Sequence, residues 1–124
     1  MNFRNFLNAV KQNDVKEVKK YLSNKDFNPA QLDSIAIESA IQHDSFDTFI
    51  LLINDKRLDP SAMDNNSLFC AIQSESISFF KELIKINKVI KKLNIEWIEN
   101  TFCAFENKNK MKETLIDILN IKNF

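Results

Sequence analysis

The stretch "NPAQLDSIAIESAIQHDSFDTFILLI" (residues 28–53) aligns without a gap with "DPSAMDNNSLFCAIQSESISFFKELI" (residues 59–84). The two segments start 31 residues apart and share a proline, an aspartate, an Ala-Ile-Gln triplet, a phenylalanine and a Leu-Ile pair at matching positions. A fixed period of about 20–50 residues indicates stacked repeats, in which each unit buries its apolar face against its neighbours. The sequence therefore predicts a repeat protein, and such proteins commonly present a surface for binding.

The repeat extends toward both ends of the chain. Ala40 and Ala71 have counterparts at Ala9, 31 residues earlier, and at Ala104, 33 residues later. Apolar residues recur around each alanine at spacings of three and four, which is typical of one face of a helix. Each unit is therefore predicted to be a helix, a tight turn, a second helix and a longer connection, with the alanine at a close helix–helix contact.

The predicted fold is all-α: an α-solenoid of four stacked helix-turn-helix units. It is interpreted as a single domain, residues 1–124, with units at about 1–31, 32–62, 63–94 and 95–124. Helices are predicted at 2–12, 14–23, 33–43, 45–54, 64–74, 76–87, 95–107 and 109–122. The connections 24–32 and 55–63 each contain a proline, and the third connection, 88–94, contains none, so it is expected to differ.

Residues that favour helix starts and tight turns recur in the same register. Five residues after each alanine stands a predicted N-cap: Asp14, Ser45, Ser76 and Asn109. The residue before each of them must take a left-handed conformation, which Asn13 and Asp44 tolerate well. Glu75 and Lys108 tolerate it only at a cost. The turns at these two residues are therefore predicted to be strained or differently shaped.

Two segments, "NDVKEVKKYL" (13–22) and "LLINDKRLDPSAMDNNSLFCAIQ" (51–73), resemble a degenerate ankyrin repeat array of the kind found in large DNA viruses, amoebae or phages. The resemblance covers residues 3–84 well and 95–122 loosely. The chain departs from the family in lacking its turn glycines, its Thr-Pro-Leu-His stretch and its 33-residue step. The resemblance then implies that Asp33 and Asp64 stabilise the helix starts and that the hairpins of the family are shortened to plain loops.

Charge and targeting signals narrow the function. The formal net charge is zero, which argues against a nucleic-acid groove. Residues 26–75 carry nine acidic and two basic groups, whereas both flanking segments are basic. The acidic middle is interpreted either as a solvated face or as a surface that attracts a basic partner. There is no leader pattern at the start and no membrane-span pattern, so a cytoplasmic location is predicted, and the host cytoplasm if the source is viral.

No constellation for catalysis or cofactor binding stands out, so the chain is predicted not to be an enzyme and to bind no metal or cofactor. Cys70 and Cys103 lie at equivalent positions of adjacent units and are expected to be free thiols that fill partly buried space. His43, the only histidine, is interpreted as a polar group at a helix C-terminus or as a binding contact. A chain without glycine cannot form a glycine-rich phosphate loop.

The resemblance also implies a binding surface, because ankyrin arrays bind proteins through the inner side of their first helices and the connecting loops. Trp97 is interpreted as packing against the third connection or as an exposed contact for a partner, and Phe79 is expected to face away from the core. Carried over by position, the predicted partner-binding residues are Asp33, Ser34, Ser39, His43, Asp44, Asp64, Asn65, Ser67, Cys70, Ser74, Trp97 and Asn100.

The predicted function is a non-enzymatic protein–protein interaction module, with a viral or phage stoichiometric inhibitor or adaptor acting on a host protein as its specific form. Both terminal units are interpreted as polar-faced caps of a complete array. One alternative is a self-assembling structural subunit that forms homo-oligomers. Another is a nucleic-acid or nucleotide binder that uses a face of the helix at 76–87 and the residues after it, with the lysines Lys81, Lys85, Lys88, Lys91 and Lys92.

Overall fold

The computed structural model describes residues 2–103 and 109–122, and these residues form helices without any strand. The predicted helix bounds agree with the observed ones to within a few residues, apart from the region after residue 83. The helices are α1 (Phe3–Lys11), α2 (Val15–Ser23), α3 (Ile35–Gln42), α4 (Phe46–Ile53), α5 (Ala62–Gln73), α6 (Ile77–Leu83), α7 (Asn87–Lys91), α8 (Ile95–Phe102) and α9 (Asn109–Lys122).

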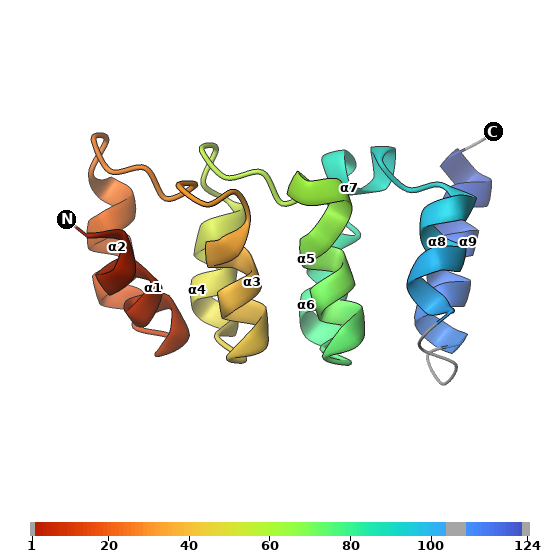
Figure 1. Ribbon diagram of the computed structural model, residues 1–124, viewed down its shortest axis with the longest axis horizontal. Helices are drawn as coiled ribbons and strands as arrows, with labels where there is room; N and C mark the ends of the chain where they lie inside the picture. The colour runs from red at the N-terminus through yellow and green to blue at the C-terminus, as the bar shows by residue number, and fades with distance from the viewer. Residues whose placement is uncertain (1, 104–108, 123–124) are drawn as a thin grey trace.

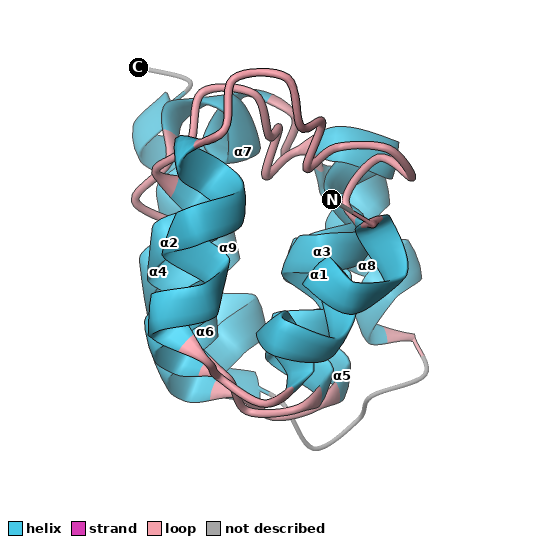
Figure 2. Ribbon diagram, turned by 90° about the vertical axis from the view of Figure 1, so that its left-hand side faces the viewer, coloured by secondary structure: helices cyan, strands magenta, loops and turns pink. Residues whose placement is uncertain are grey.

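Within the described residues the helices pack as pairs that stand side by side in a row (Figure 1). The first pair is α1 and α2, the second α3 and α4, the third α5 and α6, and the fourth α8 and α9. Seen along the row, α1, α3, α5 and α8 form one layer and α2, α4, α6 and α9 form the other (Figure 2). The long connections gather at one end of the helices and the short turns at the other.

The tight turns inside the pairs repeat one geometry. Asn13, Asp44 and Glu75 have φ angles of 54°, 55° and 54°, which is the left-handed conformation that the register predicts. In each turn the next residue donates its backbone N–H to the alanine carbonyl five residues earlier, at 2.8–2.9 Å. The turn at Glu75 has the same shape as the other two, so the predicted alternative of a different shape is wrong there. The other alternative, strain, agrees with the structure, because the backbone holds this glutamate in the left-handed region. Lys108 lies outside the described residues.

Asp14, Ser45 and Ser76 occupy the predicted N-cap positions of the second helices, but the predicted capping hydrogen bond is observed only at Asp14. Asp14 Oδ1 accepts from the Glu17 N–H at 3.1 Å. Ser45 and Ser76 occupy the N-cap positions of α4 and α6, but their side chains form no capping hydrogen bond. The Ser45 hydroxyl instead donates to the Lys11 carbonyl of the first pair at 3.1 Å. The side chain of Asn109 lies outside the described residues.

The starts of the first helices differ from the expectation. Asp33 and Asp64 do not cap them, because both have left-handed backbones with φ of 54° and 53°. Ser34 takes the N-cap position of α3, and its hydroxyl donates to the Glu38 carboxylate instead of a backbone group. Residues 63–65 are all left-handed inside the assigned bounds of α5, so regular helix begins only after them.

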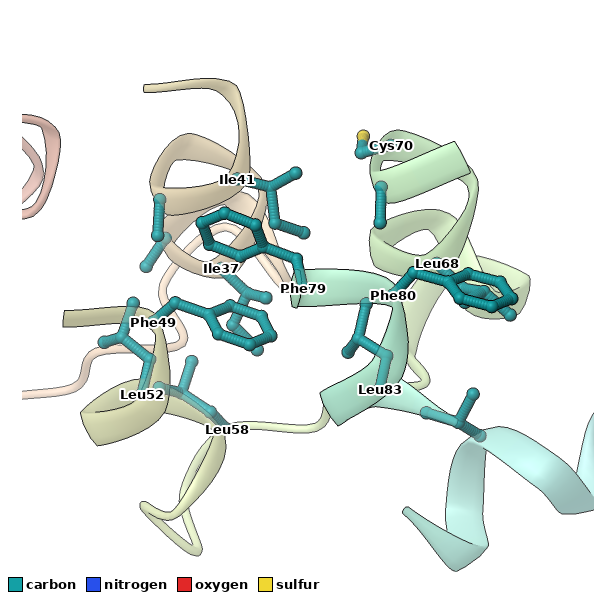
Figure 3. Close-up of a cluster of buried hydrophobic side chains, with 14 of the residues drawn as sticks. Ile37, Ile41, Phe49, Leu52, Leu58, Leu68, Cys70, Phe79, Phe80 and Leu83 are labelled. Atoms are coloured by element: carbon teal, nitrogen blue, oxygen red, sulfur yellow. The ribbon is translucent and has the colours of Figure 1, made fainter. Parts of the chain in front are cut away.

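The core contains three of the four predicted alanines, the fourth of which, Ala104, lies outside the described residues, and it also contains Phe79, which was predicted to face away from it. Ala9, Ala40 and Ala71 are buried, as their place at helix contacts requires. Phe79, expected to face away from the core, is only 2% exposed and lies edge-on to Phe49, with the ring centroids 4.8 Å apart (Figure 3). The expectation failed because the second layer is covered by neighbouring helices on its flanks as well as on its inner side.

The predicted helix at 76–87 breaks earlier, after Leu83, because Ile86 takes an extended conformation with ψ of 121°. The short helix α7 then occupies the predicted third connection, 88–94. Val89 and Leu93 are 0% and 2% exposed, so burying these two side chains turns the chain away from the axis of α6. The third connection therefore differs from the other two, as the missing proline indicated.

Basic side chains from two connections and from the end of α9 reach backbone carbonyls of a neighbouring pair or connection. Arg57 donates to three carbonyls at the end of the first pair at 2.6–3.1 Å. Lys92 donates to the Ser61 carbonyl at 2.8 Å. Lys122 donates to three carbonyls in and after α7 at 2.9–3.2 Å. These contacts satisfy carbonyl groups at helix ends and in loops, where cations are favourable.

Candidate binding surface

The first helices of the two inner pairs, α3 and the regular part of α5, expose only a narrow stripe on the side that faces away from their partner helices. Along α3 the exposed or half-buried side chains are Ile35, Glu38 and Gln42, at helical spacings of three and four. The rest of α3 packs against α4 and against the neighbouring helices α1 and α5. The stripe is therefore the part of the first-helix layer that a partner can reach.

Five of the predicted binding residues lie at the packed flanks of these helices instead of on the stripe: Ser34, Ser39, Asn65, Ser67 and Cys70, whose exposed fractions are 0–8%. Asn65 Nδ2, for example, donates to the Val89 carbonyl at 3.0 Å and so joins α5 to α7. The repeat register predicts which residues share a helix face, but it does not show that neighbouring helices cover both flanks of an inner helix such as α3. These five side chains do not offer a contact from solvent.

The other predicted residues remain accessible: Asp33, His43, Asp44, Asp64, Ser74 and Asn100 are exposed, and Trp97 is half-buried. Asp33 precedes α3 and Asp44 follows it, so about 12 Å of helix separates them. The acidic residues therefore lie along two edges of the layer and do not form one patch. His43 ends α3, and its Nδ1 lies 2.9 Å from the Ser39 carbonyl oxygen.

Glu38, which the sequence did not single out, lies in the middle of the stripe. Its carboxylate accepts hydrogen bonds from Ser34 Oγ and Asn66 Nδ2 and lies 3.8 Å from Cys70 Sγ. Burial, together with the charge and hydrogen bonding of Glu38, raises the pKa of the Cys70 thiol to about 11. The thiol therefore stays protonated near neutral pH and is a poor nucleophile. The spacing between Ile35 and Gln42 was the signal that could have identified Glu38.

A pocket of about 400 Å³ opens between the third and fourth pairs. Trp97 Nε1 donates to the Asp64 carbonyl at 2.8 Å, and the Trp97 N–H donates to Asn94 Oδ1 at 2.8 Å. The first bond holds the half-buried ring against the start of α5, and the second caps the start of α8. Three predicted residues, Asp64, Trp97 and Asn100, meet here. The pocket is lined by Asp64, Phe69, Asn94, Glu96, Trp97, Asn100 and Thr101.

Exposed apolar side chains recur at the loop end of the first helices. Leu32, Met63 and Ile95 are 58%, 65% and 54% exposed. They stand 31 and 32 residues apart, and each is followed directly by an exposed acidic residue: Asp33, Asp64 and Glu96. Two of these acids, Asp33 and Asp64, are predicted binding residues. The apolar residues were missed, although the 31-residue step relates Leu32 to Met63 and could have identified this pair.

The lysines in and after α6, namely Lys81, Lys85, Lys88, Lys91 and Lys92, do not form the predicted continuous helix face. All five are exposed, but the chain breaks direction after Leu83. Lys85 pairs with Glu82 at 3.1 Å, and Lys92 is held by the Ser61 carbonyl. Burial alone would raise the pKa of Asp59, but hydrogen bonds from Ser61 and the charges of Lys92 and Lys88 together lower it. Part of this basic charge is therefore neutralised within the protein.

Both thiols are free, as predicted, but only Cys70 is buried; Cys103 is exposed and its Sγ lies 3.0 Å from the Asn100 carbonyl oxygen. Within the described ranges 2–103 and 109–122, no group of three or more histidine, cysteine or acidic residues is placed to hold a metal ion. In the same ranges, no helix has the length and hydropathy needed to cross a bilayer.

Comparison of the chain with protein-family models, with curated proteins and with solved structures finds no match. The function of the chain is therefore inferred from the geometry of its helix pairs, their exposed stripe and the pocket.

Proposed function

We propose that this chain is a solenoid of ankyrin-like repeats that binds another protein through the exposed stripe and the loop end of its first helices. The observation that carries this proposal is the repetition of exposed features with the fold. Leu32-Asp33, Met63-Asp64 and Ile95-Glu96 present the same apolar–acidic pair from successive helix pairs. A row of this kind suits an extended partner surface better than a small molecule, because its contacts are spread over several units.

The charge of this surface favours a partner with a basic face. Asp33 and Asp64 lie at one edge, Asp44 lies at the other, and all three are exposed. Complementary charge accelerates association and rejects wrong partners more than it adds affinity. Binding as a stoichiometric inhibitor or an adaptor is the mode of action we propose, since it requires only such a surface.

A charge-removal experiment tests the proposal. The variant Asp33→Asn/Asp44→Asn/Asp64→Asn removes three charges but keeps residues that tolerate left-handed backbones. The control Asp26→Asn/Glu113→Gln/Asp117→Asn changes the net charge equally at exposed positions elsewhere. Each immobilised protein is used to capture partners from an extract of the source cells, and the captured proteins are quantified by mass spectrometry.

We expect one set of partners to be retained by the wild type and the control and to be reduced about tenfold on the first variant, with the difference diminishing at high salt. Equal capture by all three proteins would contradict binding at the acidic edges. Thermal unfolding of the three proteins, followed by circular dichroism, checks that the comparison is made between folded chains.

A further inference from the structure

The pocket between the third and fourth pairs combines two chemical features that suit a cation. Two of its lining residues, Phe69 and Trp97, are aromatic, and two, Asp64 and Glu96, are acidic. Aromatic faces attract cations through the quadrupole of the ring, and this attraction strengthens where the site is partly desolvated. Carboxylates add charge-assisted hydrogen bonds to the same cation.

The positions of the lining residues are set by the fold. The hydrogen bond from Trp97 Nε1 to the Asp64 carbonyl holds the indole of α8 beside the start of α5. Among the described residues, no ion pair is formed by Asp64 or Glu96, so both carboxylates are available to a ligand. Glu96 lies in the first turn of α8, where it offsets the positive end of the helix dipole that would otherwise repel a cation.

The surroundings of the pocket favour a peptide over a free small cation. Met63 and Ile95, each adjacent in sequence to a lining carboxylate, are 65% and 54% exposed. A peptide segment that places a basic side chain in the pocket can cover these apolar side chains with its flanking residues. A free cation leaves both of these apolar side chains in water.

We propose that this pocket binds an arginine or lysine side chain of a protein partner, flanked in the partner by apolar residues that contact Met63 and Ile95. The inference rests on the proposed protein-binding function and names its anchor point. Asp33 matches Asp64 in the repeat, but the residues 32 and 31 positions before Trp97 are Asn65 and Asn66, so no tryptophan accompanies Asp33. Asp26 and Glu113 are exposed acids outside the pocket and outside the proposed binding surface, so they serve as matched controls.

The single tryptophan of the chain reports directly on the pocket. The full chain is titrated with the blocked peptide acetyl-Leu-Arg-Leu-amide, and the indole N–H resonance and the fluorescence of Trp97 are followed. Acetyl-Leu-citrulline-Leu-amide, which has nearly the same shape without the charge, and N-acetylarginine amide, which lacks the flanking leucines, are titrated in parallel.

We expect saturable binding of the arginine peptide, with the citrulline peptide and the free arginine amide each about tenfold weaker. The variant Asp64→Asn/Glu96→Gln should weaken binding of the arginine peptide about tenfold, and the control Asp26→Asn/Glu113→Gln, which removes two charges at exposed positions outside the pocket, should leave it unchanged. Equal binding of the arginine and citrulline peptides, or no saturation by about 10 mM peptide, would overturn the proposal. If N-acetylarginine amide binds as tightly as the arginine peptide, the proposed contacts of the flanking apolar residues with Met63 and Ile95 are wrong.

A failure of the pocket proposal can be distinguished from a failure of the proposed function. A captured partner can bind Asp64→Asn/Glu96→Gln as tightly as the wild type and yet lose affinity for Asp33→Asn/Asp44→Asn/Asp64→Asn. That result supports the proposed function and shows that the pocket does not bind the partner's basic side chain. A partner that loses about tenfold in affinity on Asp64→Asn/Glu96→Gln and none on Asp26→Asn/Glu113→Gln supports the pocket.

Discussion

At the scale of single residues, the third pair has a buried polar side chain, Ser67, where the second pair has an apolar one. Ser67 and its counterpart 31 residues earlier, Ala36, are both fully buried. Within the described part of the chain, neither Ser67 Oγ nor Asn65 Oδ1 has a hydrogen-bond partner. A buried polar group without a partner costs about 1–3 kcal/mol, because it loses its bonds to water without replacement. These two atoms therefore weaken the packing of α5.

The variant Ser67→Ala should raise the free energy of unfolding by about 1 kcal/mol, because it removes the unsatisfied hydroxyl and Ala36 already occupies the matching place. Urea unfolding followed by circular dichroism measures the change. The control Ser45→Ala should lower stability by about 1 kcal/mol, since the Ser45 hydroxyl bonds the Lys11 carbonyl. A clear loss of stability in Ser67→Ala would show that its hydroxyl has a partner after all.

At the scale of elements, the connections are held by a basic side chain that reaches the neighbouring pair. Arg57 illustrates this arrangement, because its guanidinium bonds carbonyls of the first pair while also pairing with Asp55 at 2.7 Å. The hydrogen bond from Arg57 lowers the pKa of Asp55 against the opposing effect of burial, and the charge of Arg57 adds to this. Asp55 in turn raises the pKa of Arg57. The carboxylate orients the guanidinium toward the first pair.

The sign of the pH dependence follows from this lowered pKa. The ionised Asp55 stabilises the fold above its unfolded pKa of about 3.9, and this stabilisation is lost as the pH falls toward the lower folded pKa. We expect Asp55→Asn to lower stability by about 1 kcal/mol at pH 7 and to equal the wild type below about pH 3.

Urea unfolding of Asp55→Asn at a series of pH values measures this difference. The variant Asp26→Asn, which removes an exposed carboxylate elsewhere, is measured in parallel as the control. A stability gap that persists unchanged below about pH 3 would mean that Asp55 acts through packing and not through its charge.

At the scale of the whole molecule, the row of pairs is tightest at its first three members. The first helices α1, α3 and α5 contact one another in turn, whereas α8 packs chiefly against α9. The fourth pair is joined to the third through α7, the bond between Trp97 and Asp64, and the bonds from Lys122 to carbonyls around α7. In stacked arrangements each unit depends on its contacts with its neighbours, so the fourth pair should be the least stable.

We expect the fluorescence of Trp97 to change at a lower urea concentration than the helix signal in circular dichroism, because Trp97 reports only the junction with the fourth pair. The variant Lys122→Met, which keeps the apolar stem but loses the bonds to the carbonyls, should move only the fluorescence transition to lower urea. Coincident transitions in the wild type would show that all the pairs unfold as one unit.

Much of the local structure could be predicted because it depends on neighbours in sequence. The 31-residue step placed most helices to within a few residues, and it placed the left-handed turns at Asn13, Asp44 and Glu75. These features follow from apolar spacing and from a few backbone hydrogen bonds between residues close in the chain. The candidate surface was predicted only in part: Asp33, Asp44 and Asp64 are exposed, but Ser39 and Ser67 are buried.

By itself, the sequence determined the all-helical class, the repeat and the positions of its turns. Only the tertiary structure decided which side of each helix meets solvent, because helices distant in sequence cover the flanks. Packing also placed Phe79 in the core, and the burial of Val89 and Leu93 broke the lysine face. The pocket around Trp97 depends on a contact with Asp64, 33 residues away, that no local pattern encodes. Burial and long-range contact depend on the packed chain, and a periodic sequence specifies only part of that packing.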